Sequence, residues 1–580
     1  MVVVLRLVGI SDDLAAAEGS IQAASTALED GRIADARTAL DVASAQIEVA
    51  TASLYNSPEL GLVGWVPVVS DNLRSLEDSL GLISSLVHGG RRILTVAEPL
   101  EGPDGRFEIS IDNGRVPIEP IERARVEIDT LVGSLPGGPR SGSSRLVGPV
   151  DDLRRRVDDE VALRRDQLDG LRRALGIVST LSGAAQDRRY LISVANTAEM
   201  RGSGGMMLNY GVLEARGGVV SLEQFGRIDD LALTGPVPPE FVDLPDDYLA
   251  RWDGFDVTQR WRNANMAADY EVVAPVFAAM YEASTGEAVD GVIQIDPAGL
   301  AQLLSFVGPV TVDEVGVVTA ANVVDVTLNQ AYIDFPDVEQ RTEVLQAVAE
   351  AAIDRLFSTS VTSIRDLGEL LHTAVQERHL LVYSVGSSAQ AHLRYFGATG
   401  GLPPADSAYF LLGTQNVSAN KLDYYLDTAL ELRGEATGEI TAEVRLHNTA
   451  PVGLTEPSYI FGPFDSSQQA GVYRGVVSLY VPRGTSVLEA EVPGAVGPPI
   501  VVAEDGRTVV SYTTNVPAGV MDTASFRLRL PPGVAAADML ELVPTPRVRP
   551  TRYDVEVTTT NGALRSSGVL ESSVRLAVES

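Results

Sequence analysis

Arg201 stands directly before a run of glycine and serine, in the stretch NTAEMRGSGGMMLNYG that spans 196–211. A guanidinium can grip a phosphate through two parallel hydrogen bonds, and the backbone N–H groups of a glycine-rich loop can cradle the same anion. The run lies between two strand-like segments and lacks the Lys-Ser/Thr ending of a nucleotide-binding loop. Two interpretations stay open: a hairpin turn, which the pattern favours slightly, and an anion-binding nest that Arg201 completes.

A second polar segment, TQRWRNANMAADY, contains Arg260, Arg262, Asn263 and Asn265 within six residues. One interpretation is a surface loop that caps the helix following it. The other is the rim of a pocket for phosphate or sugar, in which the two arginines bind phosphate and the two asparagines, together with Ser203 of the glycine run, are polar pocket residues.

A third polar segment, YIDFPDVEQR, carries Asp334, Asp337 and Arg341. Acidic residues are common where a helix begins, because they interact favourably with the positive end of its dipole. The same carboxylates and arginine could instead hold a metal-bound pyrophosphate. Asp334 and Asp337 are therefore candidate metal ligands, and Arg341 is a further candidate phosphate ligand.

Composition argues against several classes of protein. The chain has no cysteine, which removes disulfides, thiolate catalysis and zinc–thiolate sites. Its five histidines are scattered, and no Gly-x-Ser-x-Gly elbow of a serine hydrolase is present. A formal net charge of −33, from 45 basic and 78 acidic residues, makes nucleic acid a poor partner. Lys421 is the only lysine, an arginine bias that we interpret as compositional rather than functional.

Regular apolar spacing predicts helices in the first part of the chain. Large apolar residues recur every seven positions on both sides of Gly31, with alanines between them: Leu14, Ile21 and Leu28, then Ile33, Leu40, Ile47 and Leu54. Such a stripe predicts two closely packed helices in an antiparallel hairpin. A third helix is expected from about residue 73, and a fourth over about 150–181 with its arginines on a solvated face.

Mixed patterns follow the helical part. Strand-like and helical segments alternate over 185–427, where Asp296-Pro297 indicates an N-cap and the first turn of a helix rather than a catalytic residue. Residues 428–580 alternate with period two between Pro/Gly turns. The expected architecture is multidomain: a helical, coiled-coil-like hairpin or bundle over 1–184, an α/β core with a mixed sheet over 185–427, and an antiparallel β-sandwich over 428–580.

The chain begins with an apolar run over 2–10 that Arg6 interrupts. A membrane-spanning helix needs about 20 apolar residues. The run also lacks the basic leader and the cleavage site of a signal peptide. A truncated membrane anchor and a plain buried segment both fit this pattern.

Four longer segments carry a resemblance to a known family: RRYLISVANTAEMRGSGGMMLNYGVLE, RWRNANMAADY, TGEAVDGVIQIDPAGLAQLLSFVGPV and NVSANKLDYYL. They resemble the bacterial cell-envelope family catalogued as domain of unknown function 4012, over residues 187–427. The helical and β-rich flanks also resemble those of that family. The resemblance implies an extracytoplasmic envelope protein whose full-length relatives carry an N-terminal membrane anchor, which is absent or truncated here.

A fainter likeness concerns the LytR-CpsA-Psr phosphotransferases, which move a polyprenyl-pyrophosphate-linked glycopolymer onto the cell wall. RGSGGMML is similar to their RSDTMML, and DFPDVEQRTEVLQAV is similar to their DFGRIERQQEFL. The resemblance implies that Arg201 grips phosphate, that Asp334 and Arg341 form the second half of the site, and that magnesium stabilises the diphosphate. The Ser203-Gly204 region replaces the aspartate of RSDT, which puts a magnesium ligand in question.

Two functions follow as expectations. The first is an extracytoplasmic envelope protein that binds a polyprenyl-phosphate-linked or otherwise phosphorylated glycan, with glycopolymer phosphotransfer in cell-wall assembly as its chemistry. The second is a non-catalytic envelope scaffold or interaction protein, whose N-terminal helices pair with a protein partner and whose β-sandwich contacts cell-wall polymer.

Overall fold

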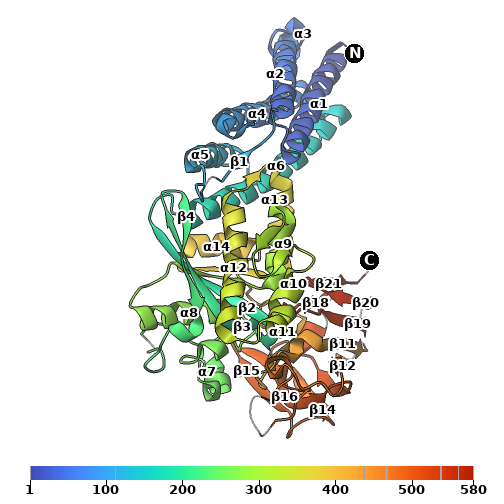
Figure 1. Cartoon of the computed structure of the whole chain (residues 1–580). Coiled ribbons are helices and arrows are strands. Elements are labelled where there is room, and N and C mark those ends of the chain that lie inside the picture. Colours follow the sequence, from blue (N-terminus) through green and yellow to red (C-terminus); the bar gives the residue numbers. More distant parts are fainter. Residues whose placement is uncertain are drawn as a thin grey trace. The chain divides into compact units, whose positions relative to one another are not determined.

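The computed structural model describes residues 2–102, 104–111, 113–238, 240–435, 438–463, 468–535, 539–559 and 561–578 (Figure 1). The chain divides into two compact units. The helical unit comprises Met1–Asp187, Ala215–Val220 and Phe357–Gly368, and the sheet unit comprises Arg188–Glu214, Ser221–Leu356 and Glu369–Ser580. Within the described ranges, no helix is both long and apolar enough to cross a membrane.

The helical unit contains the N-terminal helices that the spacing predicts. Its helices are α1 (Val2–Glu29), α2 (Ile33–Tyr55), α3 (Pro58–Val63), α4 (Pro67–Val96), α5 (Ile118–Ser134) and α6 (Gly148–Leu181), with the short 3-10 helix η1 (Glu98–Leu100) and a two-stranded sheet of β1 (Ile109–Ser110) and β8 (Ser360–Val361). Helix α4 begins earlier than predicted because Pro67 occupies its first turn, where proline is favoured. Helix α5 was not predicted.

Helices α1 and α2 pack through the predicted stripe. The buried members of the seven-residue repeats are Leu14 and Ile21 of α1 and Ile33, Leu40, Ile47 and Leu54 of α2, with Ala36, Ala43 and Ala50 buried between the latter. The small alanines allow the two helices to approach closely. Leu28 departs from the prediction and is exposed, because it lies in the last turn of α1, just before the turn at Gly31.

Two adjacent glycines in α4 allow close contact with two other helices. A Cβ atom on Gly89 would lie 2.6 Å from Cδ1 of Leu131 in α5, and one on Gly90 would lie 3.0 Å from Cδ1 of Leu40 in α2. A close-packed interior does not tolerate such distances without movement. Helix α4 therefore packs so closely against α2 and α5 that a side chain at either glycine would require the facing leucine to move.

The arginines of α6 do not all face solvent, contrary to the expectation. Arg155 and Arg156 are exposed, but the side chain of Arg164 is largely buried, where it bonds Glu160 of the same helix and Ser25 of α1. Arg165 donates to the carbonyl oxygen of Leu135, just after α5. The arginine-rich face is thus partly covered by neighbouring elements, which its periodicity alone does not reveal.

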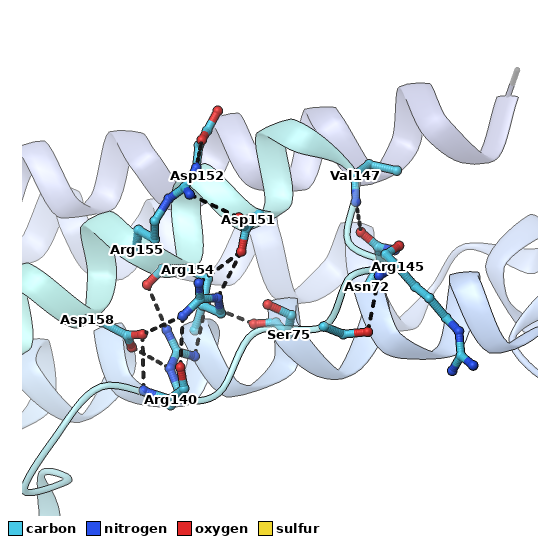
Figure 2. A network of polar contacts seen from close by, with 12 residues as sticks. Asn72, Ser75, Arg140, Arg145, Val147, Asp151, Asp152, Arg154, Arg155 and Asp158 are labelled. Carbon is cyan, nitrogen blue, oxygen red and sulfur yellow. Dashed lines mark hydrogen bonds and ion pairs between the residues drawn. The ribbon is translucent and has the colours of Figure 1, made fainter.

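Figure 2 shows how the loop between α5 and α6 is held to α6 by a buried carboxylate. Asp158 accepts hydrogen bonds from Nε of Arg140 at 2.6 Å and from Nη1 of Arg154 at 3.1 Å. Arg154 also donates to the carbonyl oxygen of Arg140 at 2.8 Å. Asn72 of α4 bonds the same loop twice, by donating to the carbonyl of Arg145 and accepting from the N–H of Val147. Each buried charge therefore has a partner, as burial requires.

A mixed five-stranded sheet forms the centre of the sheet unit, in the order β4-β3-β2-β5-β9. Strands β2 and β5 pair in parallel, and β5 and β9 pair antiparallel. The strands are β2 (Arg188–Arg201), β3 (Gly204–Arg216), β4 (Val219–Arg227), β5 (Gly291–Ile295) and β9 (Leu380–Ser384). This sheet confirms the predicted α/β region.

Helices and short elements surround this sheet. They are α7 (Asp246–Trp252), α8 (Tyr270–Thr285), α9 (Pro297–Val307), α10 (Val323–Asp325), α11 (Ala331–Asp334), α12 (Val338–Phe357), α13 (Ile364–Gln376) and α14 (Ser387–Tyr395), with the strand pair β6 (Val310–Val312) and β7 (Gly316–Val318). A π-helix, η5 (Val326–Gln330), joins α10 to α11, and three 3-10 turns, η2 (Ile228–Asp230), η3 (Asp253–Phe255) and η4 (Trp261–Asn263), precede α8.

Two six-stranded sheets enclose the C-terminal core. One has the order β15-β16-β13-β10-β18-β21 and the other the order β14-β17-β12-β11-β19-β20. Their strands are β10 (Tyr409–Asn416), β11 (Leu426–Gly434), β12 (Glu439–Asn448), β13 (Val472–Val481), β14 (Ser486–Glu491), β15 (Ile500–Glu504), β16 (Arg507–Pro517), β17 (Met521–Arg529), β18 (Met539–Val543), β19 (Thr551–Thr558), β20 (Ala563–Leu570) and β21 (Val574–Ala577). The short helices η6 (Leu422–Tyr425), α15 (Ser458–Phe461) and α16 (Pro532–Ala535) connect them.

These two sheets are mixed, so the expectation of purely antiparallel strands is corrected. Strand β18 pairs in parallel with β10, and β19 pairs in parallel with β11. The parallel pairs arise because the chain returns to both sheets after β17, which period-two alternation cannot reveal. Phe410, Leu430, Phe526 and Val555, from both sheets, share one buried apolar core.

Asp296 caps helix α9, as predicted. Its Oδ1 atom accepts from the N–H of Gly299 at 2.9 Å, and Pro297 begins the helix. Its other oxygen lies 2.7 Å from Nδ1 of His379, the residue just before β9. Burial lowers the pKa of His379, but the carboxylate of Asp296 more than offsets this, so the net pKa is raised above 6.5.

We expect this pair to stabilise the protein more at low pH. Because the folded protein holds the His379 proton more tightly than the unfolded chain does, the stabilisation is fully present below pH 6.5 and is lost as the pH rises through the raised pKa. The difference in thermal unfolding midpoint between wild type and His379→Gln should be larger at a pH of about 5.5 than at a pH of about 9. The first value lies below the pKa of histidine in the unfolded chain, and the second lies above the range in which the stabilisation is lost. A difference that does not change with pH would contradict the ion pair.

Leu40→Asp should destabilise the helical unit. The change places a carboxylate in the seam between α1, α2 and α4 without a partner, at a cost of about 3 kcal/mol or more. Val42→Asp is the matched control, because Val42 is exposed on the same helix, and it should change stability by only about 0.5 kcal/mol. Thermal unfolding followed by circular dichroism measures both, and equal midpoints would rule out the described packing.

Candidate functional site

The glycine run forms the turn between strands β2 and β3. Arg201 is the last residue of β2, Gly202 and Ser203 make the turn, and β3 begins at Gly204. The turn is buried rather than exposed at a loop tip. Its surroundings therefore decide what Arg201 can contact.

Close backbone contacts explain the glycines of this turn. A Cβ atom on Gly202 would lie 2.2 Å from the carbonyl oxygen of Met266, and one on Gly205 would lie 2.1 Å from the backbone carbon of Asn196. No side chain fits at such distances. The turn thus needs glycine for packing against neighbouring backbone, independently of any anion.

Two segments of the sheet unit bond the glycine run directly, and a third bonds the neighbouring Met266. Asn265, just after η4, donates to the carbonyl of Gly205 at 2.8 Å, and Gln294 of β5 donates to the carbonyl of Ser203 at 2.9 Å. Gln415 of β10 donates to the carbonyl of Met266 at 3.1 Å. The turn is therefore bonded both to the central sheet and to a segment that contacts the C-terminal sheets.

Three buried oxygens near the turn lack a hydrogen-bond partner among the described residues: Oγ of Ser203, Oδ1 of Asn265 and Oε1 of Gln294. The three residues are almost completely buried. Buried polar atoms in proteins are nearly always bonded to protein or to ordered water. These atoms are the unpaired part of an otherwise well-bonded polar cluster.

Arg201 is buried and bonded to protein atoms on all sides. Its Nε donates to the carbonyl of Arg262 at 2.9 Å, and its Nη1 donates to the carbonyls of Met200 at 2.9 Å and Asn416 at 2.7 Å. Its Nη2 donates to Oδ1 of Asn263 at 3.3 Å. Burial lowers the pKa of Arg201 to about 10, which leaves the guanidinium charged at neutral pH.

A buried ion pair lies beside this cluster. Nζ of Lys421 bonds Oε1 of Glu199, which lies two residues before Arg201 on β2. The side chain of Lys421 is only 1 % exposed. Burial alone would lower the pKa of Lys421, but Glu199 more than offsets this, so the net pKa is raised and the ammonium stays charged.

Two tyrosines extend the charged cluster to Arg341. The ammonium of Lys421 lies 4.1 Å from the ring centroid of Tyr332, and the guanidinium of Arg341 lies 4.7 Å from the ring centroids of both Tyr332 and Tyr459. The two rings stack with centroids 5.7 Å apart. Arg341 also donates to the carbonyl of Phe335 at 2.9 Å. Aromatic faces are favourable neighbours for both cations.

A second carboxylate, Asp423, joins β2 to the C-terminal sheets. It accepts from the N–H of Met200 at 3.0 Å and from Nδ2 of Asn416 at 2.9 Å. Nη2 of Arg547 lies 3.5 Å from its other oxygen. Asp423 and Arg547 are both buried, so β2 meets the sheets through paired charges at two points.

The structure therefore brings some candidate residues together and not others. Arg201, Ser203, Asn263 and Asn265 lie around the glycine turn, as the contacts above describe. Arg262 contributes its carbonyl there, while its side chain pairs with Asp229 at 2.6 Å in a more exposed position. Arg260 is exposed and pairs with Asp256 at 2.7 Å.

The two candidate metal ligands make local contacts near α12. Asp334 accepts from the side chain of Gln330 at 2.8 Å, and Asp337 accepts from the N–H of Gln340 at 3.0 Å, which is a capping contact. Among the described residues, no group of three or more His, Asp or Glu side chains is arranged to hold a metal ion. This donor set does not fit a metal site built by the protein.

A groove of about 360 Å³ in the helical unit was not anticipated. It lies between the loop after α5 and the face of α6, where Gly137, Arg165, Asp166 and Asp169 line it. Two of its charged lining residues already have partners, since Asp158 bonds two arginines and Arg165 donates to the carbonyl of Leu135. Asp169 is paired as well, with Arg172 and Arg173 of the same helix.

The charged partners Glu199, Lys421, Asp423 and Arg547 were missed from the sequence. One signal was present, because Lys421 is the single lysine in a chain that otherwise uses arginine. A lysine retained against such a bias indicates a position where a compact ammonium is needed. The other three residues carry no such signal, since aspartate, glutamate and arginine are common throughout the chain.

Comparison with known proteins adds one finding. Residues 185–332 match the family model described as protein of unknown function, DUF4012. The match covers about a quarter of the chain and includes Glu199, Arg201 and Tyr332, while Lys421 and Asp423 lie beyond it. No curated protein and no solved structure matches the chain.

Lys421→Met should destabilise the protein strongly. The change leaves Glu199 buried without its partner, at a cost of about 3–5 kcal/mol. The double variant Glu199→Gln with Lys421→Met should recover much of this loss, because no charge is then left unpaired. Urea unfolding of the three proteins measures the coupling, and a double variant as unstable as Lys421→Met would contradict the pairing.

Proposed function

We propose that this protein is a non-catalytic scaffold or interaction protein of the bacterial cell envelope. In this proposal the helical unit pairs with a protein partner, and the C-terminal sheets contact cell-wall polymer. One observation carries the proposal: four of the five N–H groups of the Arg201 guanidinium donate hydrogen bonds to atoms of the protein itself. An arginine that grips a diphosphate needs those donors for its ligand.

The second arginine of the proposed diphosphate site supports the same conclusion. Arg341 lies against the rings of Tyr332 and Tyr459 and donates to the carbonyls of Phe335 and Pro336. A diphosphate would have to displace these contacts as well as those of Arg201. In this proposal, the chain resembles LytR-CpsA-Psr phosphotransferases in sequence but does not carry out their phosphotransfer reaction.

A second candidate function is supported by a different observation. The unpaired oxygens of Ser203, Asn265 and Gln294 are gathered beside Arg201, as in a polar pocket that awaits a ligand. On this alternative the protein is extracytoplasmic and binds a polyprenyl-phosphate-linked or otherwise phosphorylated glycan, with glycopolymer phosphotransfer as its chemistry. The buried turn would have to open to admit such a ligand.

Substitution of Arg201 separates the two candidates. For a scaffold, Arg201→Ala should lower the free energy of unfolding by about 3–5 kcal/mol, because it leaves several buried acceptors without a donor. Arg201→Lys should also be destabilising, since an ammonium cannot reproduce the planar fork. Arg260→Ala is the control and should cost under about 1 kcal/mol, because its ion pair is exposed.

Binding of a short-chain polyprenyl pyrophosphate completes the test. Calorimetric titration should show no saturable binding by the wild type if the protein is a scaffold. Binding by wild type that weakens in Arg201→Ala or Arg201→Lys, with unfolding midpoints nearly unchanged, would reject the scaffold and support the glycan-binding alternative.

A further inference from the structure

Strand β15 ends one of the two C-terminal sheets and leaves one edge unpaired. It is the first strand in the order β15-β16-β13-β10-β18-β21, and within the described ranges it pairs with β16 alone. Its turn to β16 contains two residues, Asp505 and Gly506, both with positive φ. Hydrogen bonding alternates along the strand from that turn, so the N–H and C=O groups of Val501 and Ala503 point away from β16. These groups can bond a further strand.

The apolar core is incomplete at this edge. Val501 lies opposite Val510 of β16, which is buried in the core that the two C-terminal sheets share. Val501 faces the same core, because paired residues in antiparallel strands lie on one face of the sheet. Nevertheless, Val501 is 53 % exposed, and its neighbour Ile500, on the opposite face, is 54 % exposed. An added strand would cover apolar side chains on both faces.

The end of β15 at its turn is held in place by helix α7. Asp247 accepts hydrogen bonds from the N–H groups of Asp505 and Gly506 at 2.9 and 2.7 Å, and Arg251 bonds Glu504 at 2.6 Å. A strand that is already fixed loses little conformational freedom when it pairs with another one. The edge can therefore receive a strand without rearrangement.

Strand β15 also lacks the charges that protect other open sheet edges. Charged side chains on an edge strand hinder its pairing with another chain. Four other end strands of the three larger sheets carry such charges: Glu223 and Arg227 on β4, Glu489 and Glu491 on β14, Arg565 on β20 and Arg575 on β21. The remaining end strand, β9, is uncharged, but the N–H of its Val382 bonds Ala398. Residues 492–503, which include most of β15, contain no charged side chain.

We propose that β15 pairs antiparallel with β15 of a second copy of this chain. A two-fold axis perpendicular to the sheet brings the two open edges together, so the contact closes after two copies. The same pairing of a charged edge strand would bring like charges together, which is destabilising. On β15 it brings Ile500, Val501 and Ala503 against the second strand and continues the sheet into that of the second copy. An uncharged edge is the part of a chain with a net charge of −33 at which two copies repel each other least.

This inference goes beyond the proposed function and does not rest on the site around Arg201. Sedimentation equilibrium of the whole chain over a series of concentrations tests it. The average mass should rise gradually from 61.6 kDa toward twice that value, because a contact between two short strands is weak. Added salt should strengthen the association, because it screens the repulsion between the two negatively charged copies.

Val501→Lys should weaken the association about tenfold or more, because the two paired edges then carry like charges. Val569→Lys is the matched control, since Val569 is 49 % exposed on β20, another edge strand, and it should leave the association unchanged. Circular dichroism should show that both variants unfold near the wild-type temperature, because both side chains are half-exposed. A weaker association of Val501→Lys then cannot be attributed to unfolding.

Cysteine cross-linking gives an independent readout, because the natural chain has no cysteine. Paired residues share a face of the sheet, so the two-fold axis places one residue of β15 directly opposite the same residue of the second copy. Among Ile500→Cys, Val501→Cys, Val502→Cys and Ala503→Cys, the variant nearest the axis should form a disulfide-linked dimer fastest under mild oxidation. The control Val569→Cys should stay monomeric.

Three results would each overturn the proposal. The first is a wild type that sediments at 61.6 kDa at every concentration. The second is a Val501→Lys variant that associates as strongly as wild type. The third is a cysteine series in which no variant of residues 500–503 cross-links faster than Val569→Cys.

Discussion

Charge buried between the central sheet and the C-terminal sheets is the constraint on which the sheet unit depends. Glu199 and Asp423 would be costly to bury alone, and each has a partner from a distant part of the chain: Lys421 for Glu199 and Arg547 for Asp423. The pairs can form only when the end of β2 lies beside the segment after β10. Apolar packing alone is compatible with many arrangements of two sheets. These charge pairs, in contrast, can form in only one of those arrangements.

Arg201 belongs to the same constraint. Its guanidinium donates to the carbonyls of Arg262 and Asn416, so a single side chain joins η4 to β10. The glycines are needed for the same reason, because the turn must come close to the backbone of Met266. An arginine beside a glycine run can thus serve packing as well as ligand binding, and residue type alone does not distinguish the two.

The parts of the fold that the sequence predicts are those with strong local periodicity. The hairpin of α1 and α2 follows from Leu14, Leu40 and their repeats, because each helix must bury one stripe. The cap at Asp296 was predictable because capping involves neighbouring residues only. The parallel pairing of β10 with β18 was not, because it depends on the path by which the chain returns. The partners of Glu199 and Asp423 were hidden for a similar reason, since they are more than a hundred residues away in sequence.

The position of Lys421 has a practical consequence for following the protein in its folded state. It is the only lysine, and its side chain is almost wholly enclosed. A lysine-specific protease can therefore cut this chain at one place. It can do so only after the contact between β2 and the C-terminal sheets has opened. The rate of cleavage follows the population of the open state when opening and closing are fast. The rate of this single cut therefore measures the local stability of the contact between β2 and the C-terminal sheets. The chain thus carries an internal proteolytic reporter of its own buried ion pair.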